Sequence, residues 1–61
     1  MAHLITEPNM PAPDDFYADL IAAHTGLSDD ESEAFNARLI LVLANHIGNQ
    51  TILREALEAS K

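Results

Sequence analysis

Apolar side chains recur at helical spacing along most of this chain, and no segment alternates apolar and polar residues as a half-buried strand would. The periodic positions fall in three segments, at 14–25, 28–47 and 49–60. Residues 1–13 contain all three prolines of the chain, which keep such a segment extended and outside helices. The pattern therefore predicts an all-α fold, in which an extended arm precedes one domain of three helices, short, long and short, at residues 14–61.

Residues that cap helices stand at the predicted helix ends. Ser28 and Glu31 match an S-x-x-E capping box, in which the Ser28 hydroxyl accepts from the Glu31 N–H and the Glu31 carboxylate accepts from the Ser28 N–H. Asp14 or its neighbour Asp15 is expected to cap the first helix, and Asn49 the third. Glycines are expected to end the first two helices, at Gly26 and Gly48.

The long helix at 28–47 is apolar around well over half of its circumference. At about 100° per residue, only Glu31, Arg38 and Asn45 form a narrow polar stripe. Each short helix is expected to fold back antiparallel as a hairpin, so that the first covers the N-terminal half of the long helix and the third covers the C-terminal half. One neighbour for each half leaves apolar surface uncovered. The residues expected to line that surface are Phe35, Leu39, Ile40, Val42, Leu43 and Ile47.

An uncovered apolar face of this kind predicts an interface. Two-fold pairing is the commonest form of assembly, so the first expectation is a homodimeric helical bundle built around two copies of the long helix. Two alternatives stay open at this point: a different protein covers the face, or the arm at 1–13 folds over it.

Size and charge limit the class of partner. A chain of 61 residues has a marginal core, and this one has no cysteine for disulfides or thiolate–zinc sites. Its net charge is -7, and eight of its ten acids stand at or before Glu33. Because such a chain repels nucleic-acid phosphates and anionic membranes, neither is expected as a partner. With no signal sequence and no apolar run long enough to span a bilayer, the expected location is cytoplasmic.

The chain carries no motif for a known reaction. His3, His24 and His46 lack the spacing of metal ligands, and there is neither a nucleophile elbow nor a phosphate-binding loop. Two small helical hairpins are not expected to enclose a pocket of roughly several hundred cubic ångströms. No catalytic, cofactor-binding or metal site is therefore expected, although an antiparallel dimer would bring His24 of one copy nearer to His46 of the other.

A few polar residues lie on or beside the apolar long helix. Arg38 is the only base in the first fifty residues, and Asn45 and His46 end the apolar stretch. Arg38 can be solvated, pair with an acid of a neighbour, or clamp an acidic ligand. Asn45 and His46 either tie the long helix to the arm or to the third helix, or bond a ligand or the backbone of a partner.

Three sequence motifs carry a family resemblance. The chain reads FY-x-x-LI-x-AH-x-GLS over 16–28, N-x-RL-x-L-x-LANHIG over 36–48 and LREAL over 53–57. In these motifs it resembles a family of small bacterial proteins built on a domain of unknown function, DUF2783. The family pattern has a smaller or aliphatic residue in place of Phe35 and aspartate in place of Asn49. It also marks four polar positions, at Asn36, Arg38, Asn45 and His46.

No activity comes with that resemblance. It implies genes placed beside flavin-dependent oxygenases of aromatic degradation, and hence the role of an accessory subunit. Together with the missing catalytic motifs, this favours a small acidic interaction protein that is not an enzyme, that self-associates through the helix at 28–47, and that serves as an accessory or regulatory subunit of a bacterial metabolic enzyme. The alternative is a homodimer that binds a ligand or a metal at its two-fold axis through Arg38, Asn45 and His46.

Overall fold

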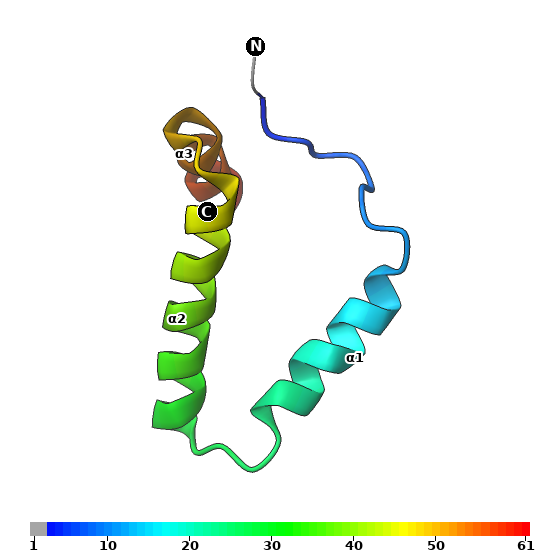
Figure 1. The fold of residues 1–61 in the computed structure, drawn as a ribbon, viewed down its shortest axis with the longest axis vertical. Coiled ribbons are helices and arrows are strands. Elements are labelled where there is room, and N and C mark those ends of the chain that lie inside the picture. Colours follow the sequence, from blue (N-terminus) through cyan, green and yellow to red (C-terminus); the bar gives the residue numbers. More distant parts are fainter. Residues whose placement is uncertain (1–2) are drawn as a thin grey trace.

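The computed structural model describes residues 3–61, and the regular structure within that range consists of three helices without a strand (Figure 1). The helices are α1 (Pro13–His24), α2 (Asp29–Ile47) and α3 (Gln50–Ala59). The all-α prediction of a short, a long and a short helix is therefore confirmed. No helix among residues 3–61 is both long enough and apolar enough to cross a bilayer.

The caps of α2 and α3 form as their residues predict. The Ser28 Oγ accepts from the Glu31 N–H at 3.2 Å, and the Glu31 Oε1 accepts from the Ser28 N–H at 2.9 Å. The bond from the Ser28 N–H to the ionised carboxylate, with a smaller contribution from the Ser28 side chain, lowers the pKa of Glu31 from its ordinary value. At the start of α3, the Asn49 Oδ1 accepts from the Ile52 N–H at 3.0 Å. The last turn of α2 ends at Gly48, whose φ of 65° lies in the left-handed region that favours glycine.

The start of α1 differs from the prediction of an aspartate cap. Pro13 occupies the first helical position, Ala12 is the cap residue, and no side chain bonds the first free N–H groups. Proline suits that position because its missing N–H would have no partner there. Asp14 and Asp15 therefore lie inside the first turn, where their charge favours the positive end of the helix dipole without capping it.

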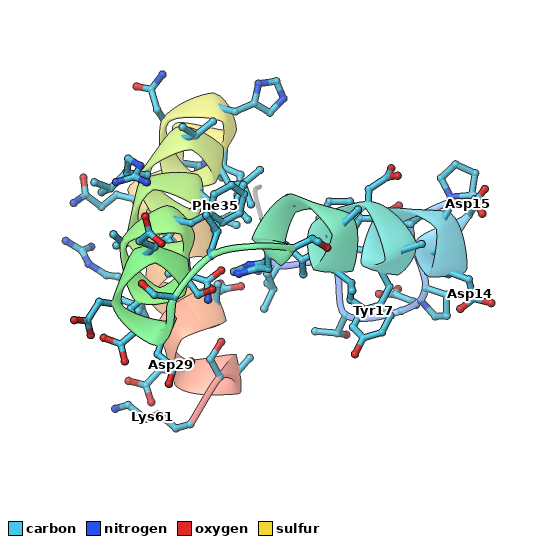
Figure 2. All side chains as sticks on the ribbon, turned by 90° about the horizontal axis from the view of Figure 1, so that it is seen from below. Asp14, Asp15, Tyr17, Asp29, Phe35 and Lys61 are labelled. Carbon is cyan, nitrogen blue, oxygen red and sulfur yellow. The ribbon has the colours of Figure 1, made fainter. Side chains whose placement is uncertain are left out.

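The first pair of helices does not close into the expected hairpin. In Figure 1, α1 diverges from α2 as the two leave their shared turn, and α2 and α3 form the main helix–helix contact. The connection at 25–28 explains the divergence, because Thr25 (ψ 128°) and Ser28 (ψ 169°) are both extended and separate the helix axes. One aromatic contact remains at the base, where the rings of His24 and Phe35 meet edge to face at 4.8 Å. Phe35 lies on the side of α2 that faces α1 (Figure 2).

The arm runs back from α1 to α3. The Leu4 N–H donates to the Glu55 Oε2 at 2.7 Å, and the His3 Nδ1 lies 3.7 Å from the Glu55 Oε1. Leu4 and Glu55 are both half-buried by this approach. As an acid beside Arg54, Glu55 would ordinarily lie on the solvated face of this helix. The structure instead makes it the point where the extended arm is attached.

Residues 3–61 enclose no core. None of residues 3–61 is buried, and the accessible surface of the chain is 5426 Å². A compact monomer of 6.6 kDa exposes about 3,900 Å², so this chain leaves a surplus of about 1,500 Å². Its radius of gyration, 13.4 Å, likewise exceeds the value of about 10.5 Å for a compact domain of this length. Much of the surface that a globular domain hides is therefore open.

Candidate interaction surface

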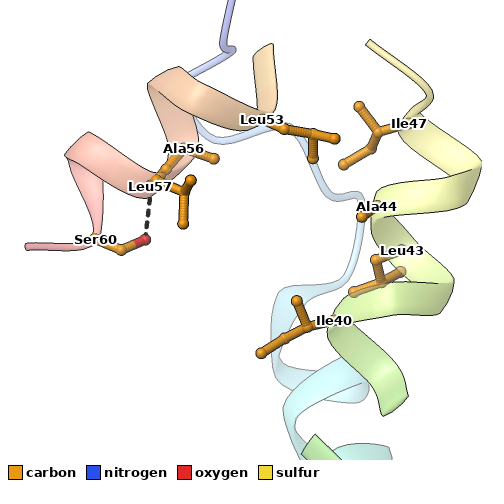
Figure 3. Close-up of a pocket in the computed structure, with 8 residues that line it drawn as sticks. All are labelled: Ile40, Leu43, Ala44, Ile47, Leu53, Ala56, Leu57 and Ser60. Atoms are coloured by element: carbon orange, nitrogen blue, oxygen red, sulfur yellow. Dashed lines mark hydrogen bonds between the residues drawn. The ribbon is translucent and has the colours of Figure 1, made fainter. Parts of the chain in front are cut away.

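A groove of about 530 Å³ lies between α2 and α3. Its two walls face each other across the corner that joins the helices (Figure 3). The lining residues are Ile40, Leu43, Ala44 and Ile47 of α2, Leu53, Ala56 and Leu57 of α3, and Ser60, which follows the end of α3. Ser60 supplies the only side-chain hydroxyl, and its Oγ already donates to the Ala56 carbonyl at 2.8 Å. The groove therefore offers an apolar surface and little polar recognition.

The corner between the helices positions the two walls. The Gly48 N–H donates to the Ala44 carbonyl at 2.9 Å, which ends α2, and the Leu53 N–H donates to the Asn49 carbonyl at 3.0 Å as α3 begins. Only residues 48 and 49 separate the two helices. This short connection brings Ile47 and Leu53 to the closed end of the groove, while the walls spread apart toward Ile40 and Ser60.

The groove is open to solvent. Ile40 and Leu57, one on each wall, expose 65% and 67% of their surface, and Leu43 and Ile47 each expose 47%. From the sequence, no enclosed pocket of roughly several hundred cubic ångströms was expected. The structure has a hollow of that volume, but as a groove that the chain leaves open. Fully burying a side chain of this size stabilises a protein by about 1.5–3 kcal/mol. A partner that filled the groove could therefore gain several such contributions.

The expected interface residues divide between two sides of α2. Ile40, Leu43 and Ile47 line the groove, whereas Phe35 lies on the side that faces α1. At about 100° per residue, Leu39 and Val42 share the side of Phe35. Phe35 and Leu39 are half-buried, and Val42 is 63% exposed. The helix thus carries two apolar seams, each with the 4-3 spacing typical of helix packing.

The four polar candidates do not meet in one place. Asn36, Arg38, Asn45 and His46 are all exposed, and none of their side chains forms a hydrogen bond or ion pair within the described range, 3–61. Arg38 and Asn45 share one stripe, two turns apart, while nine residues at about 100° place Asn36 on the opposite side from Asn45. No group of three His, Asp or Glu side chains that could hold a metal ion is present among residues 3–61.

The comparison with known proteins identifies the family. The family model described as "Protein of unknown function (DUF2783)" matches residues 4–61. The chain belongs to the DUF2783 family. The resemblance in the three motifs is thereby confirmed, and the match extends through the arm to Leu4, the residue that bonds to Glu55. No curated protein and no solved structure is significantly similar to this DUF2783 chain.

The DUF2783 family has no described function, so the evidence for an activity lies in the exposed surfaces of the structure. Sequence reasoning had identified α2 as the helix with apolar surface to spare, but it missed the groove and the attachment of the arm. The sequence did contain a signal for the groove. Leu53, Ala56 and Leu57 form an apolar stripe on α3, and a tight corner at Gly48 brings that stripe to α2. No comparable signal marked Glu55, which is one of several acids at helical spacing.

Proposed function

We propose that this protein is a small interaction protein, which self-associates through α2 and acts as an accessory or regulatory subunit of a bacterial metabolic enzyme. The observation that supports the proposal is the missing core: no side chain among residues 3–61 is buried, and about 1,500 Å² of surplus surface is open. Packing against another chain is one of the ways in which a chain of this size without disulfides is stabilised.

The N-terminal half carries a second exposed surface. On α1, Phe16 is 46% exposed, Tyr17 64% and Ile21 53%, and the helix also carries three aspartates and no lysine or arginine. An apolar patch in acidic surroundings fits a partner that presents an apolar patch surrounded by basic residues, because complementary charge steers association. Among metabolic enzymes, the sequence resemblance favours a flavin-dependent aromatic oxygenase as this partner.

Self-association is tested by the absolute mass in solution. Light scattering or sedimentation across a range of protein concentrations is expected to give the mass of a dimer at micromolar concentration. A monomer of 6.6 kDa at every concentration would contradict the self-associating part of the proposal.

The enzyme partner is tested by titrating this protein into a purified flavin-dependent aromatic oxygenase. Binding is expected to weaken when salt is raised, because the acidic half of the chain supplies long-range attraction. It is also expected to weaken at least tenfold in Tyr17→Ala, whose side chain is too exposed to affect folding much, and to persist in the control Leu41→Ala on α2. Absence of binding by the unaltered protein would contradict this part of the proposal alone.

A further inference from the structure

The chain's own first helix cannot fill the groove. Twelve residues make α1 about 18 Å long, and its C-terminal end lies beside the N-terminus of α2. Ile40 lies about 17 Å along α2 from Asp29, and Ile47 about 27 Å. Even if α1 folded back onto α2, its N-terminal end would reach only to the level of Ile40, where the groove begins.

The arm is attached away from the groove. Glu55, which holds the arm, lies two residues from both Leu53 and Leu57, which puts it about 160° around α3 from each of these groove residues. The Leu4–Glu55 hydrogen bond therefore places the arm on the opposite side of α3. The groove is left for another molecule.

The open surface is large enough for a stable dimer. A standard interface removes about 800 Å² from each partner, and this chain exposes about 1,500 Å² more than a compact monomer does. Twice that surplus lies within the range of obligate homodimers. A second copy of the chain thus has the area that the missing core requires.

The distribution of charge selects one relative orientation. Residues 1–33 hold eight acids and no lysine or arginine, whereas residues 34–61 hold three bases against two acids, a net charge of +1. A parallel pair would bring the two acidic halves together. An antiparallel pair instead places the acidic half of each copy beside the half that holds all the bases of the other.

We propose that the groove between α2 and α3 is filled by a second copy of this chain, whose α2 lies antiparallel along the α2 of the first. This inference rests on the proposed self-association. It adds which face of α2 forms the interface, how the two copies are oriented and the contribution of α3. Overlap over the full 19 residues of α2 buries the most surface and sets the two-fold axis near residue 38. The α1 helix of each copy then lies near the α3 helix of the other.

A pair of matched substitutions tests whether the groove face of α2 forms the dimer interface. Ile40 and Leu41 are neighbours on α2 with similar exposure, 65% and 70%, but only Ile40 lines the groove. Ile40→Asp is expected to weaken the dimer at least about 100-fold in sedimentation experiments, because it buries an unpaired carboxylate. Leu41→Asp is expected to stay within about threefold of the unaltered protein. Circular dichroism reports whether either variant loses helix.

Single cysteines test the orientation without relying on a destabilised variant. The chain has no cysteine of its own, so Ile40→Cys, Leu41→Cys and Ile47→Cys can each be treated with a short bismaleimide. Two copies of position 40 lie about 6 Å apart along the axis in the antiparallel pair, and two copies of position 47 about 27 Å apart. Ile40→Cys is expected to form crosslinked dimers, and the other two are not.

The outcomes separate this inference from the proposed function. If the unaltered protein is a dimer but Val42→Asp dissociates it and Ile40→Asp does not, self-association stands and the groove assignment falls. If Ile47→Cys crosslinks as readily as Ile40→Cys, the antiparallel orientation falls, because equivalent positions meet along the whole helix only in a parallel pair. If Ile40→Cys forms no crosslink while Phe16→Asp dissociates the dimer, α1 of the second copy is the occupant and the inference is overturned. If the unaltered protein is a monomer, both this inference and the proposed self-association are contradicted.

Discussion

Gly26 and Gly48 both follow the end of a helix, and both adopt positive φ, at 83° and 65°. The connections around them differ. Four residues, 25–28, separate α1 from α2, and the extended Thr25 and Ser28 within them turn the helices apart. Only residues 48 and 49 separate α2 from α3, and the Asn49 cap starts α3 at once, so these two helices face each other across a groove.

The comparison shows that a helix-ending glycine does not decide how the next helix packs. That outcome depends on the length and the dihedral angles of the residues that follow. At the first connection, the rings of His24 and Phe35 meet edge to face, while Phe16, Tyr17 and Ile21 of α1 stay exposed and available to another chain. At the second, the walls of the groove are held in place by the corner itself. The second connection is therefore expected to be the more sensitive to substitution.

Alanine at each glycine is expected to have the largest effect. Gly48→Ala places a Cβ in the left-handed region, which costs about 1–2 kcal/mol, and the same strain applies at Gly26→Ala. Neither Cβ meets a clash, since the nearest atom to the Cβ at residue 48 is the Asn45 carbonyl oxygen at 3.6 Å, and nothing lies within 4 Å at residue 26. Thermal unfolding should show a lower Tm for Gly48→Ala together with weaker self-association.

For Gly26→Ala, the expected loss is confined to the placement of α1. Amide exchange should report faster exchange near His24 and unchanged protection across α2 and α3. Equal loss of protection at both connections would contradict the view that only the second one holds a packed pair of helices.

Removal of the cap that begins α2 should have a smaller effect. Ser28→Ala is expected to destabilise α2 by about 1 kcal/mol in chemical unfolding. The bond from Ser28 also makes the stability depend on pH. Because folding lowers the pKa of Glu31, the contribution is complete above the ordinary value of 4.5 and is lost as the pH falls through the lowered value.

Glu31→Gln is the matched control for this acid dependence. Glutamine retains the capping box but does not titrate, so its unfolding free energy should depend less on pH between about 5 and 3 than that of the unaltered protein. An unchanged pH profile in Glu31→Gln would contradict the assignment of the acid dependence to this carboxylate.

The smallest effect is expected when aspartate replaces asparagine at the second cap. Asn49→Asp introduces the residue that the family pattern favours, and aspartate and asparagine cap helices about equally well. The Tm should therefore change by no more than about 2–3 °C, with a small gain from the added charge at the positive end of α3. Asn49→Ala, which removes the bond to the Ile52 N–H, should destabilise the corner by about 1 kcal/mol.

The helices could be predicted from the sequence because their signals are local. The capping box of Ser28 and Glu31, the stop at Gly48 and the cap at Asn49 each act through backbone groups within a few residues. The start of α1 was predicted less well, since Pro13 and Asp14 are both good residues for a first turn and only one of them could mark its beginning. The surplus of apolar surface on α2 was also local information, readable from its helical periodicity.

The placement of the helices depended on tertiary structure. Whether α1 folds back on α2, whether α3 leaves a groove and where Glu55 meets the arm all depend on backbone angles in short connections and on contacts between residues far apart in the chain. Periodicity describes which side of one helix is apolar, but it carries no information on the angle at which the next helix leaves. Local signals therefore specify three helices, two of them with side-chain caps, and too little core, whereas the angles of the connections and the long-range contacts specify which apolar faces remain open.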